Sequence, residues 1–184
     1  MPRLLDNYRK TVAPALRKEF GIANVMAVPK ISKITVNVGV GKASKNSGAV
    51  EKIERDLTML TGQKPSARKA KKSIASFKLR EGTVVGYTVT LRGARMWDFL
   101  DRFMSLALPL SRDFRGIDPK NFDRDGNLNI GIREHSIFPE VNLENVKDIF
   151  SLQVTITTSA GNREEGIALL RGLGFPLKNS PTRS

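Results

Sequence analysis

The chain has 184 residues, 40% of them hydrophobic, which suffices for one substantial core and argues against two large domains. Its 31 Lys and Arg residues against 18 Asp and Glu residues give a net charge of +13, so nucleic acid is the default partner. Cysteine is absent and there is a single histidine, which excludes a disulfide framework and a zinc site of Cys and His ligands.

Nothing in the sequence is expected to span a membrane. The longest mostly apolar stretch, Phe99 to Leu110, contains Asp101 and Arg102 and is too short to cross a bilayer. The N-terminal sequence MPRLLDNYRK lacks the apolar region and cleavage site of a signal peptide. We therefore expect a cytoplasmic protein.

The N-terminal third of the chain alternates between helical and strand periodicity. Apolar residues at four-residue spacing predict an amphipathic helix near residues 3–20, which Pro14 should kink or split. From Ile31 to Val40 the apolar residues recur at every second position, which predicts a strand with one buried and one polar face. Helical spacing returns at residues 50–60, and Gly62 is a typical C-terminal stop.

The segment from Lys64 to Arg80 contains seven basic residues and no acidic one. Neighbouring cations repel one another and lose hydration on burial, so this segment needs water or an anionic partner. A short charge run is most often a solvated loop. Here Ser73, Ile74, Ala75 and Phe77 interrupt the cations, and such side chains can contact sugars and bases while cations hold phosphates. The seven cations are Lys64, Arg68, Lys69, Lys71, Lys72, Lys78 and Arg80.

Residues 85–91 repeat the alternation of the first strand, and two strands with the same design predict one shared polar surface. Residues 96–106 have helical spacing, and Pro109 is expected to end this helix. We expect its aromatic residues, Trp97 among them, in the core and not in a cofactor site. No cofactor is predicted.

The C-terminal part continues with alternating segments at residues 128–132 and 152–156, which predict two more strands. Asn162, with a glutamate three residues later, resembles a capping box that starts a final helix. Gly172 or Gly174 should close that helix. These elements predict an α+β fold of two layers, with helices covering one face of a mostly antiparallel sheet of about five strands and with long projecting loops.

We expect residues 1–178 to form a single α+β RNA-binding domain, followed by a mobile tail at residues 179–184. The helix-free face of the sheet would be polar and basic, as in sheet-based RNA binders. Phosphate contacts by the basic segment would supply affinity. Asn37, Gln63 and Thr90 could hydrogen-bond base edges or ribose hydroxyls.

Two motifs suggest other chemistry but are incomplete. The sequence from Gly39 to Ser44 resembles a P-loop, yet Val36 and Ala43 occupy places where that motif requires Gly and Ser or Thr. Four oxygen ligands have the spacing of a calcium loop, but Leu128 replaces the glycine of its sharp turn, which favours a polar turn before a strand. These four residues are Asp123, Asp125, Asn127 and Glu134. No metal site is predicted.

Two alternatives to an RNA-binding structural protein remain at this stage. One is an RNA-modifying or RNA-cleaving enzyme that uses His135 or the pair Asp123 and Asp125, although no nucleophile or orienting acid lies near the histidine in sequence. A loop histidine of this kind is more often structural or a contact residue. The other alternative is a DNA-compacting protein without sequence preference.

Four motifs follow one another along the chain: GQKPSARKAKKSIASFKLREG (62–82), VTLRGARMWDFLDRF (89–103), RDFRGI (112–117) and IFPE (137–140). They resemble the bacterial form of ribosomal protein five of the large subunit, the 5S rRNA-binding protein, and the resemblance extends in order from about residue 4 to residue 177. The chain departs from the usual family pattern at Arg68, Ser76, Leu110-Ser111 and Arg124-Asp125.

The resemblance implies a non-enzymatic component of the central protuberance, present as a monomer within the ribosome. Its implied partners are 5S rRNA, large-subunit rRNA, P-site tRNA and a protein of the small-subunit head. The implied rRNA-binding residues are Lys33, Asn37, Gln63, Lys64, Arg68, Lys69, Thr90 and Arg92. The implied tRNA-proximal loop includes Lys71, Lys72, Ser73, Phe77, Lys78 and Arg80. The implied small-subunit bridge includes Asp113, Arg115, Arg133, Glu134 and His135.

Overall fold

A computed structural model describes residues 2–41, 47–75, 79–111, 114–141 and 149–178. The contacts within the chain group it into two compact units, and each is described by itself. Unit 1 comprises Met1–Ile34, Arg92–Ile130 and Thr155–Ser184, whereas unit 2 comprises Thr35–Leu91 and Gly131–Val154. The single domain and the mobile tail expected from the sequence stay predictions.

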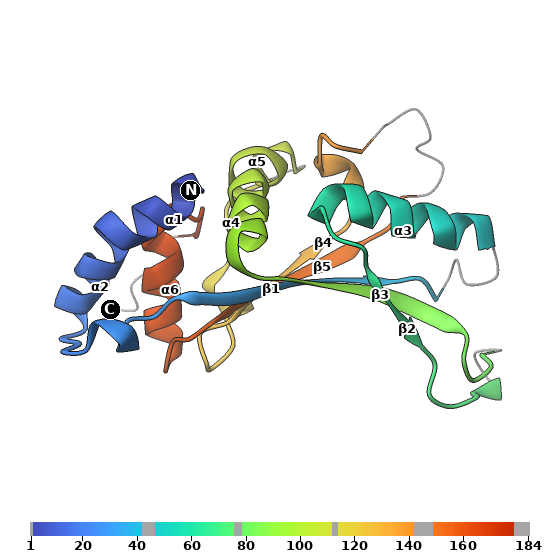
Figure 1. Ribbon diagram of the computed structural model, residues 1–184, viewed down its shortest axis with the longest axis horizontal. Helices are drawn as coiled ribbons and strands as arrows, with labels where there is room; N and C mark the ends of the chain where they lie inside the picture. Colours follow the sequence, from blue (N-terminus) through green and yellow to red (C-terminus); the bar gives the residue numbers. More distant parts are fainter. Residues whose placement is uncertain (1, 42–46, 76–78, 112–113, 142–148, 179–184) are drawn as a thin grey trace. The chain divides into compact units, whose positions relative to one another are not determined.

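Five strands form an antiparallel sheet in the order β2-β3-β1-β5-β4 (Figure 1). In β1, Val36 and Val38 are buried, whereas Thr35 is half-buried and Asn37 is exposed, as the alternation of the sequence predicted. The α+β class and the mostly antiparallel sheet of about five strands are confirmed. The strands are β1 (Ile31–Gly39), β2 (Ser66–Lys69), β3 (Val84–Leu91), β4 (Leu128–Ile132) and β5 (Leu152–Thr158).

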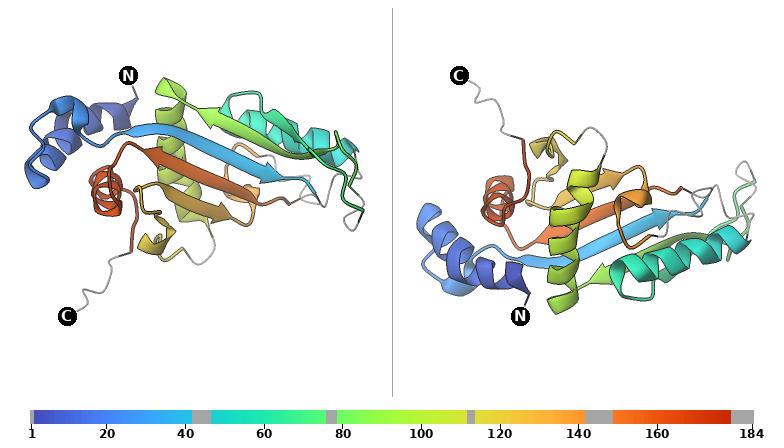
Figure 2. Two further views of the ribbon diagram at one scale, coloured as in Figure 1. Left: turned by 90° about the horizontal axis from the view of Figure 1, so that it is seen from below. Right: turned by 90° about the horizontal axis from the view of Figure 1, so that it is seen from above.

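The long helix of unit 2, α3 (Ser47–Thr61), lies on one face of β1 and β3 (Figure 2). It buries Ile53, Leu57 and Leu60, three of the residues whose spacing predicted it. Gly62 follows it with φ +65°, a left-handed conformation that glycine adopts without steric cost, so the predicted stop is confirmed.

Two helices of unit 1 continue through a proline that was expected to kink or end them. The first consists of α1 (Arg3–Asn7), the π-helical turn η1 (Tyr8–Val12) and α2 (Ala13–Glu19). The amide of Ala13 donates to the carbonyl of Tyr8, five residues back, directly before Pro14. A widened turn removes the clash between a proline ring and the carbonyl four residues earlier, so the helix persists.

The second helix has a π-helical turn as well. α4 (Gly93–Arg102) continues through η4 (Phe103–Ala107) into α5 (Leu108–Leu110), so the helix ends one residue after Pro109, close to the expected end. The wide turn also changes which residues face the core. Leu106, the last residue of the helical spacing found in the sequence and part of this turn, is 45% exposed, whereas Leu108 is buried.

The helices of unit 1 pack through aromatic side chains. Phe99 and Phe103 stack with ring centroids 5.9 Å apart, and Tyr8 lies at the same centroid distance from Trp97. Phe99, Phe103 and Trp97 are buried, which confirms them as core residues. Burial raises the pKa of Tyr8, whose hydroxyl donates to the carbonyl of Pro29 at 3.0 Å.

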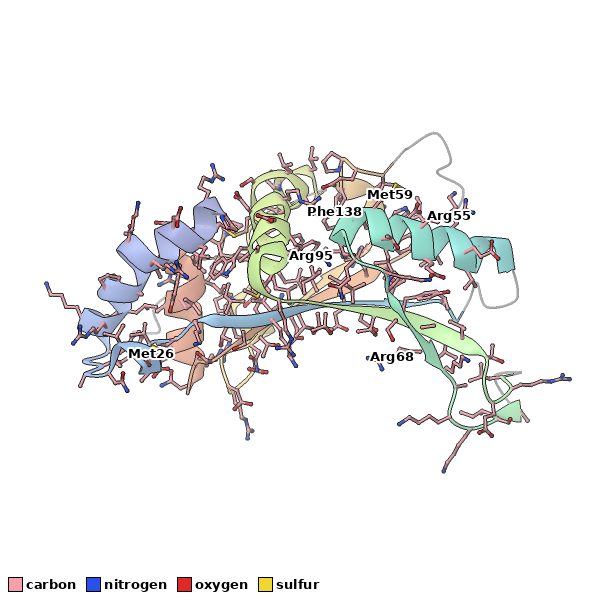
Figure 3. The ribbon with its side chains drawn as sticks, viewed as in Figure 1. Met26, Arg55, Met59, Arg68, Arg95 and Phe138 are labelled. Atoms are coloured by element: carbon pink, nitrogen blue, oxygen red, sulfur yellow. The ribbon has the colours of Figure 1, made fainter. Side chains whose placement is uncertain are left out.

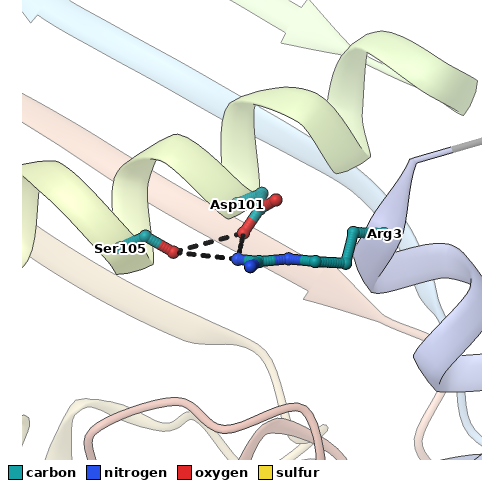
Figure 4. Close-up of polar contacts among 3 residues, drawn as sticks. All are labelled: Arg3, Asp101 and Ser105. Carbon is teal, nitrogen blue, oxygen red and sulfur yellow. Dashed lines mark hydrogen bonds and ion pairs between the residues drawn. The ribbon is translucent and has the colours of Figure 1, made fainter.

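A polar contact ties α1 to α4 at the surface of unit 1. The Arg3 guanidinium lies 2.7 Å from an Asp101 carboxylate oxygen, and the Ser105 hydroxyl donates to that same oxygen at 3.2 Å (Figure 4). The Arg3 side chain is 76% exposed, so this ion pair contributes little to stability and mainly sets the position of the N-terminal helix.

The last helix, α6 (Arg163–Gly172), begins and ends as predicted. The side chain of Asn162 accepts a hydrogen bond from the amide of Glu165 at 2.9 Å, and Glu165 accepts one from the amide of Gly161 at 2.9 Å. At the other end Gly174 has φ +87° and the amide of Phe175 donates to the carbonyl of Leu170, which is a Schellman motif.

The short 3-10 helices are η2 (Val25–Ala27), η5 (Pro119–Asn121) and η6 (His135–Ile137).

Candidate nucleic-acid interface

Unit 2 carries a polar strand surface on the side of β1 and β3 that faces away from α3. The Thr88 hydroxyl donates to the side-chain oxygen of Asn37 at 3.0 Å, which joins the two strands across this surface. Thr35 and Thr90 extend it, because residues two positions apart share a strand face. The surface therefore presents amide and hydroxyl groups that can pair with bases or riboses.

Strand β2 adds a cation to this surface. It pairs with β3 in antiparallel register, Ser66 opposite Thr88 and Arg68 opposite Gly86, so these side chains share one face. Figure 3 shows Arg68 on one side of the sheet and Arg55 of α3 on the other. Both arginines are exposed.

Gly86 allows β1 and β3 to approach closely at the centre of the polar surface. A Cβ at this position would lie 2.8 Å from the carbonyl oxygen of Val38, shorter than real Cβ contacts. The close pairing of β1 with β3 therefore requires glycine at position 86. On the other side of β3, Arg68 of β2 lies opposite Gly86.

Beyond β2 the basic segment forms a two-stranded projection, and we call its described part, with β2, the basic finger (residues 66–75 and 79–83; Figure 1). The amide of Ala70 donates to the carbonyl of Thr83 at 2.8 Å, and Ile74 and Leu79 exchange two hydrogen bonds nearer the tip. The Ser73 hydroxyl accepts from the amide of Glu81 at 2.9 Å. Backbone hydrogen bonds thus hold the two sides of the finger together.

The described cations of the finger are exposed. Lys64, at its base, lies 4.0 Å from Glu54 with 83% of its side chain exposed, a geometry that neutralises little charge. Within the described part of the chain, the other basic side chains of the finger form no ion pair; they are Arg68, Lys69, Lys71, Lys72 and Arg80. Phe77 and Lys78 lie outside the described residues.

Gln63 occupies the junction between α3 and the finger. Its side-chain nitrogen donates to the carbonyl of Thr90 at 3.3 Å, and its own backbone carbonyl accepts from the Thr61 hydroxyl at 3.0 Å. Gln63 therefore fixes the start of the finger against β3.

The predicted rRNA-binding residues divide between the two units. Gln63, Thr90, Asn37 and the finger cations belong to unit 2, as described above. Lys33, half-buried on β1, and Arg92, exposed after β3, belong to unit 1. The sequence prediction did not select Ser66, Thr88 or Thr35 as contacts, although the last two occupy the polar positions of their alternating strands.

The residues of the predicted small-subunit bridge differ in exposure. Arg115 of unit 1 and Arg133 of unit 2 are exposed, and Glu134 is half-buried. Asp113 lies outside the described residues. His135 is 6% exposed, so it offers almost no surface to a partner.

His135 is instead a packing residue of unit 2. Its ring stacks on Phe150 at a centroid distance of 3.9 Å, and its Nδ1 accepts from the Phe150 amide at 3.3 Å. Nε2 lies 3.8 Å from a carboxylate oxygen of Asp56 on α3. Burial lowers the pKa of His135, although Asp56 acts in the opposite direction.

The calcium-like spacing forms a turn. The Asp123 carboxylate accepts from the backbone amide of Asn127 at 2.7 Å and from its side-chain nitrogen at 2.8 Å. Gly126 has φ +77° within this turn, as the alternative interpretation expected. Among the described residues no group of three or more His, Cys, Asp or Glu side chains could hold a metal ion.

Comparison with known proteins decides the family. A family model described as the ribosomal L5P family C-terminus matches residues 84–177, and one described as ribosomal protein L5 matches residues 24–80. The chain belongs to the uL5 family of large ribosomal subunit proteins.

Three relatives named large ribosomal subunit protein uL5 cover almost the whole chain. The protein from Herpetosiphon aurantiacus is 54% identical over 179 residues, 97% of this chain and 100% of the relative. Those from Kocuria rhizophila and Nocardia farcinica are each 50% identical over 179 residues, 97% of this chain and 95% and 96% of the relatives.

Membership of the uL5 family makes this chain a structural ribosomal protein that associates with rRNA in the large subunit. The family is not enzymatic, so the hypothesis of an RNA-modifying or RNA-cleaving enzyme is set aside. No helix among the described residues is long and apolar enough to cross a membrane.

Proposed function

We propose that this uL5-family protein binds 5S rRNA and attaches it to the central protuberance of the large subunit. The observation that carries the proposal is the combination, in unit 2, of a polar strand surface with a finger of exposed cations that have no acidic partners among the described residues. The cations attract phosphates, and the amides and hydroxyls set the register of the RNA.

The rRNA-binding surface has a neutral and a charged part. Asn37 and Thr88 form the neutral part; the hydrogen bond between them leaves the two N–H donors of the Asn37 amide group unused. Arg68 and Lys69 supply phosphate contacts beside it, with Lys64 at the base of the finger. In unit 1, Lys33 and Arg92 are proposed as cationic rRNA contacts in their own right.

The tip of the basic finger contacts P-site tRNA in this proposal. Lys71, Lys72 and Arg80 are exposed there, and the hairpin-like pairing of the backbone carries them away from the rest of unit 2 (Figure 1). Because the finger projects from unit 2, P-site tRNA could approach its tip while 5S rRNA stays bound to the strand surface.

The contact with the small-subunit head is proposed for exposed residues only. Arg115 and Arg133 are accessible, and Glu134 is partly so. His135 is left out of this contact, because its burial assigns it to positioning the segment that carries Arg133 and Glu134.

A matched pair of variants tests the rRNA-binding surface. Arg68→Ala and Arg55→Ala each remove one exposed arginine of unit 2, from opposite sides of the sheet (Figure 3). We expect Arg68→Ala to weaken 5S rRNA binding by about 1 kcal/mol or more, roughly fivefold, and to lower the salt slope by about one, since one phosphate contact is lost. Equal effects of both substitutions in a filter-binding titration would reject the polar surface as the RNA site.

Duplex DNA of similar length serves as the competitor in the same titration. If the protein bound duplex DNA as tightly as 5S rRNA at equal salt, the DNA-compacting alternative would replace this proposal.

A further inference from the structure

A groove in unit 1 has no part in the proposed contacts with 5S rRNA, tRNA or the small subunit. It has a volume of about 510 Å³ and lies between α2 and the segment that leads through η2 to β1. Its lining residues are Arg9, Ala13, Pro14, Arg17, Lys18, Ile22, Val25 and Val28.

The walls of this groove are aliphatic and extend to the surface. Val25 is 61% exposed, and its neighbour Met26 on η2 is 77% exposed (Figure 3). Two adjacent apolar side chains with this exposure cost free energy in water. Val25 lines the groove, so an apolar side chain placed there would cover it, next to Met26 in the chain.

The rim of the groove is cationic. Arg9, Arg17 and Lys18 line it, and no carboxylate is among the described residues that do so. The Arg17 guanidinium also donates to the carbonyls of Ile22 and Ala23, at 3.2 and 3.1 Å. These bonds hold one wall in place while the guanidinium keeps its positive charge, so the groove is formed before anything binds.

We propose that this groove binds an acidic peptide segment of a partner protein, whose aliphatic or aromatic side chain inserts beside Val25 while its carboxylates pair with the rim. The cations alone would also suit RNA. However, phosphates leave an aliphatic wall uncovered, no aromatic ring is among the described residues that line the groove, and the Arg17 guanidinium is already bonded to the carbonyls of Ile22 and Ala23. Peptide side chains account for the apolar wall and the charged rim together.

Fluorescence anisotropy with a designed probe tests this proposal. The probe is a short fluorescein-labelled peptide in which Leu and Phe alternate with Asp and Glu; one control peptide replaces the acids by Gln and another replaces Leu and Phe by Ser. Both control peptides should bind at least about tenfold more weakly, because each lacks one half of the recognition.

Two exposed methionines provide matched variants. Met26→Asp places a carboxylate next to the groove residue Val25 and should weaken binding of the acidic probe by about tenfold or more, chiefly through added repulsion. Met59→Asp, at a 52% exposed position on α3 in unit 2, should leave it unchanged. Both variants should bind 5S rRNA like the parent protein, which separates this surface from the rRNA-binding surface.

Three results would overturn the proposal. The first is that Met26→Asp and Met59→Asp weaken probe binding equally. The second is that an RNA duplex displaces the acidic probe from the parent protein and that Met26→Asp abolishes binding of this duplex. The third is that the protein self-associates and that Met26→Asp abolishes the self-association. The second would assign the groove to RNA and the third to another copy of the chain.

Discussion

At the scale of single residues, His135 shows how burial fixes a protonation state. Nδ1 accepts a hydrogen bond from the Phe150 amide, so this nitrogen must be unprotonated. The ring is enclosed between Phe150 and α3, where a charge would lose its hydration. Asp56 favours the charged form but does not outweigh burial, so the pKa of His135 is lowered.

This environment predicts a loss of stability in mild acid. Because the folded-state pKa of His135 lies below the ordinary value of 6.5, the unfolded chain binds more protons as the pH falls through that value. Stability is therefore complete above about pH 6.5 and falls as the pH moves towards the lowered pKa. Thermal unfolding from about pH 7.5 to about pH 5.5 should show a falling midpoint.

His135→Gln provides the control for that measurement. His135 is the single histidine of the chain, so the variant should have a much flatter midpoint over this pH range, whatever its absolute stability. A slope as steep as that of the parent protein would contradict the role of the imidazole.

A second residue-scale prediction concerns the close approach of β1 and β3. Gly86→Ala places a methyl group 2.8 Å from the Val38 carbonyl, and only a shift of the backbone can relieve this contact. We expect a loss of about 1–3 kcal/mol in the free energy of unfolding, measured by urea titration. Gly131→Ala in β4 is the matched control, since its added methyl meets no atom within 4 Å, and it should have little effect.

At the scale of elements, local signals in the sequence predicted most boundaries correctly. Asn162 and Gly174 define α6 through hydrogen bonds between neighbours in the chain, and such signals are visible in sequence. The strands β1 and β3 were found through their alternation. Each of these two strands has one buried face, and this burial produces the alternation of apolar and polar residues that is visible in the sequence.

The failures have equally definite causes. Strand β2 carries no apolar alternation, because all four of its residues are exposed, and its pairing with β3 was therefore not predicted. Proline rules allowed a split of the first helix at Pro14, but a π-helical turn before this proline lets the helix continue. At Pro109 the second helix ends one residue later, close to the expected end. In the candidate site, charge and alternation identified the cations and Asn37, whereas Ser66 became a candidate only through the register of β2.

The cap of α6 gives a prediction at this scale. Asn162→Ala removes the side-chain acceptor for the Glu165 amide and should lower the free energy of unfolding by about 1 kcal/mol. Asn162→Asp keeps an acceptor at the helix N-terminus and should cost much less. Chemical denaturation of both variants checks the difference; equal losses would contradict the capping role.

At the scale of the whole molecule, the net charge of +13 has a definite consequence. Such an excess repels itself in the folded protein and favours a partner that neutralises it. Among the described residues of unit 2, the basic finger carries five cations that form no ion pair, beside a strand surface of amide and hydroxyl groups. In a uL5-family protein with this distribution, the phosphates of rRNA would neutralise the exposed positive charge.

The salt dependence of 5S rRNA binding tests this central claim most directly. If about five phosphates are neutralised, the logarithm of the association constant should fall with the logarithm of salt concentration at a slope of roughly −4. A fourfold increase in salt should then weaken binding by about two orders of magnitude. An affinity that stays constant across the same range would contradict the account, because a surface that binds RNA through its cations must release counterions.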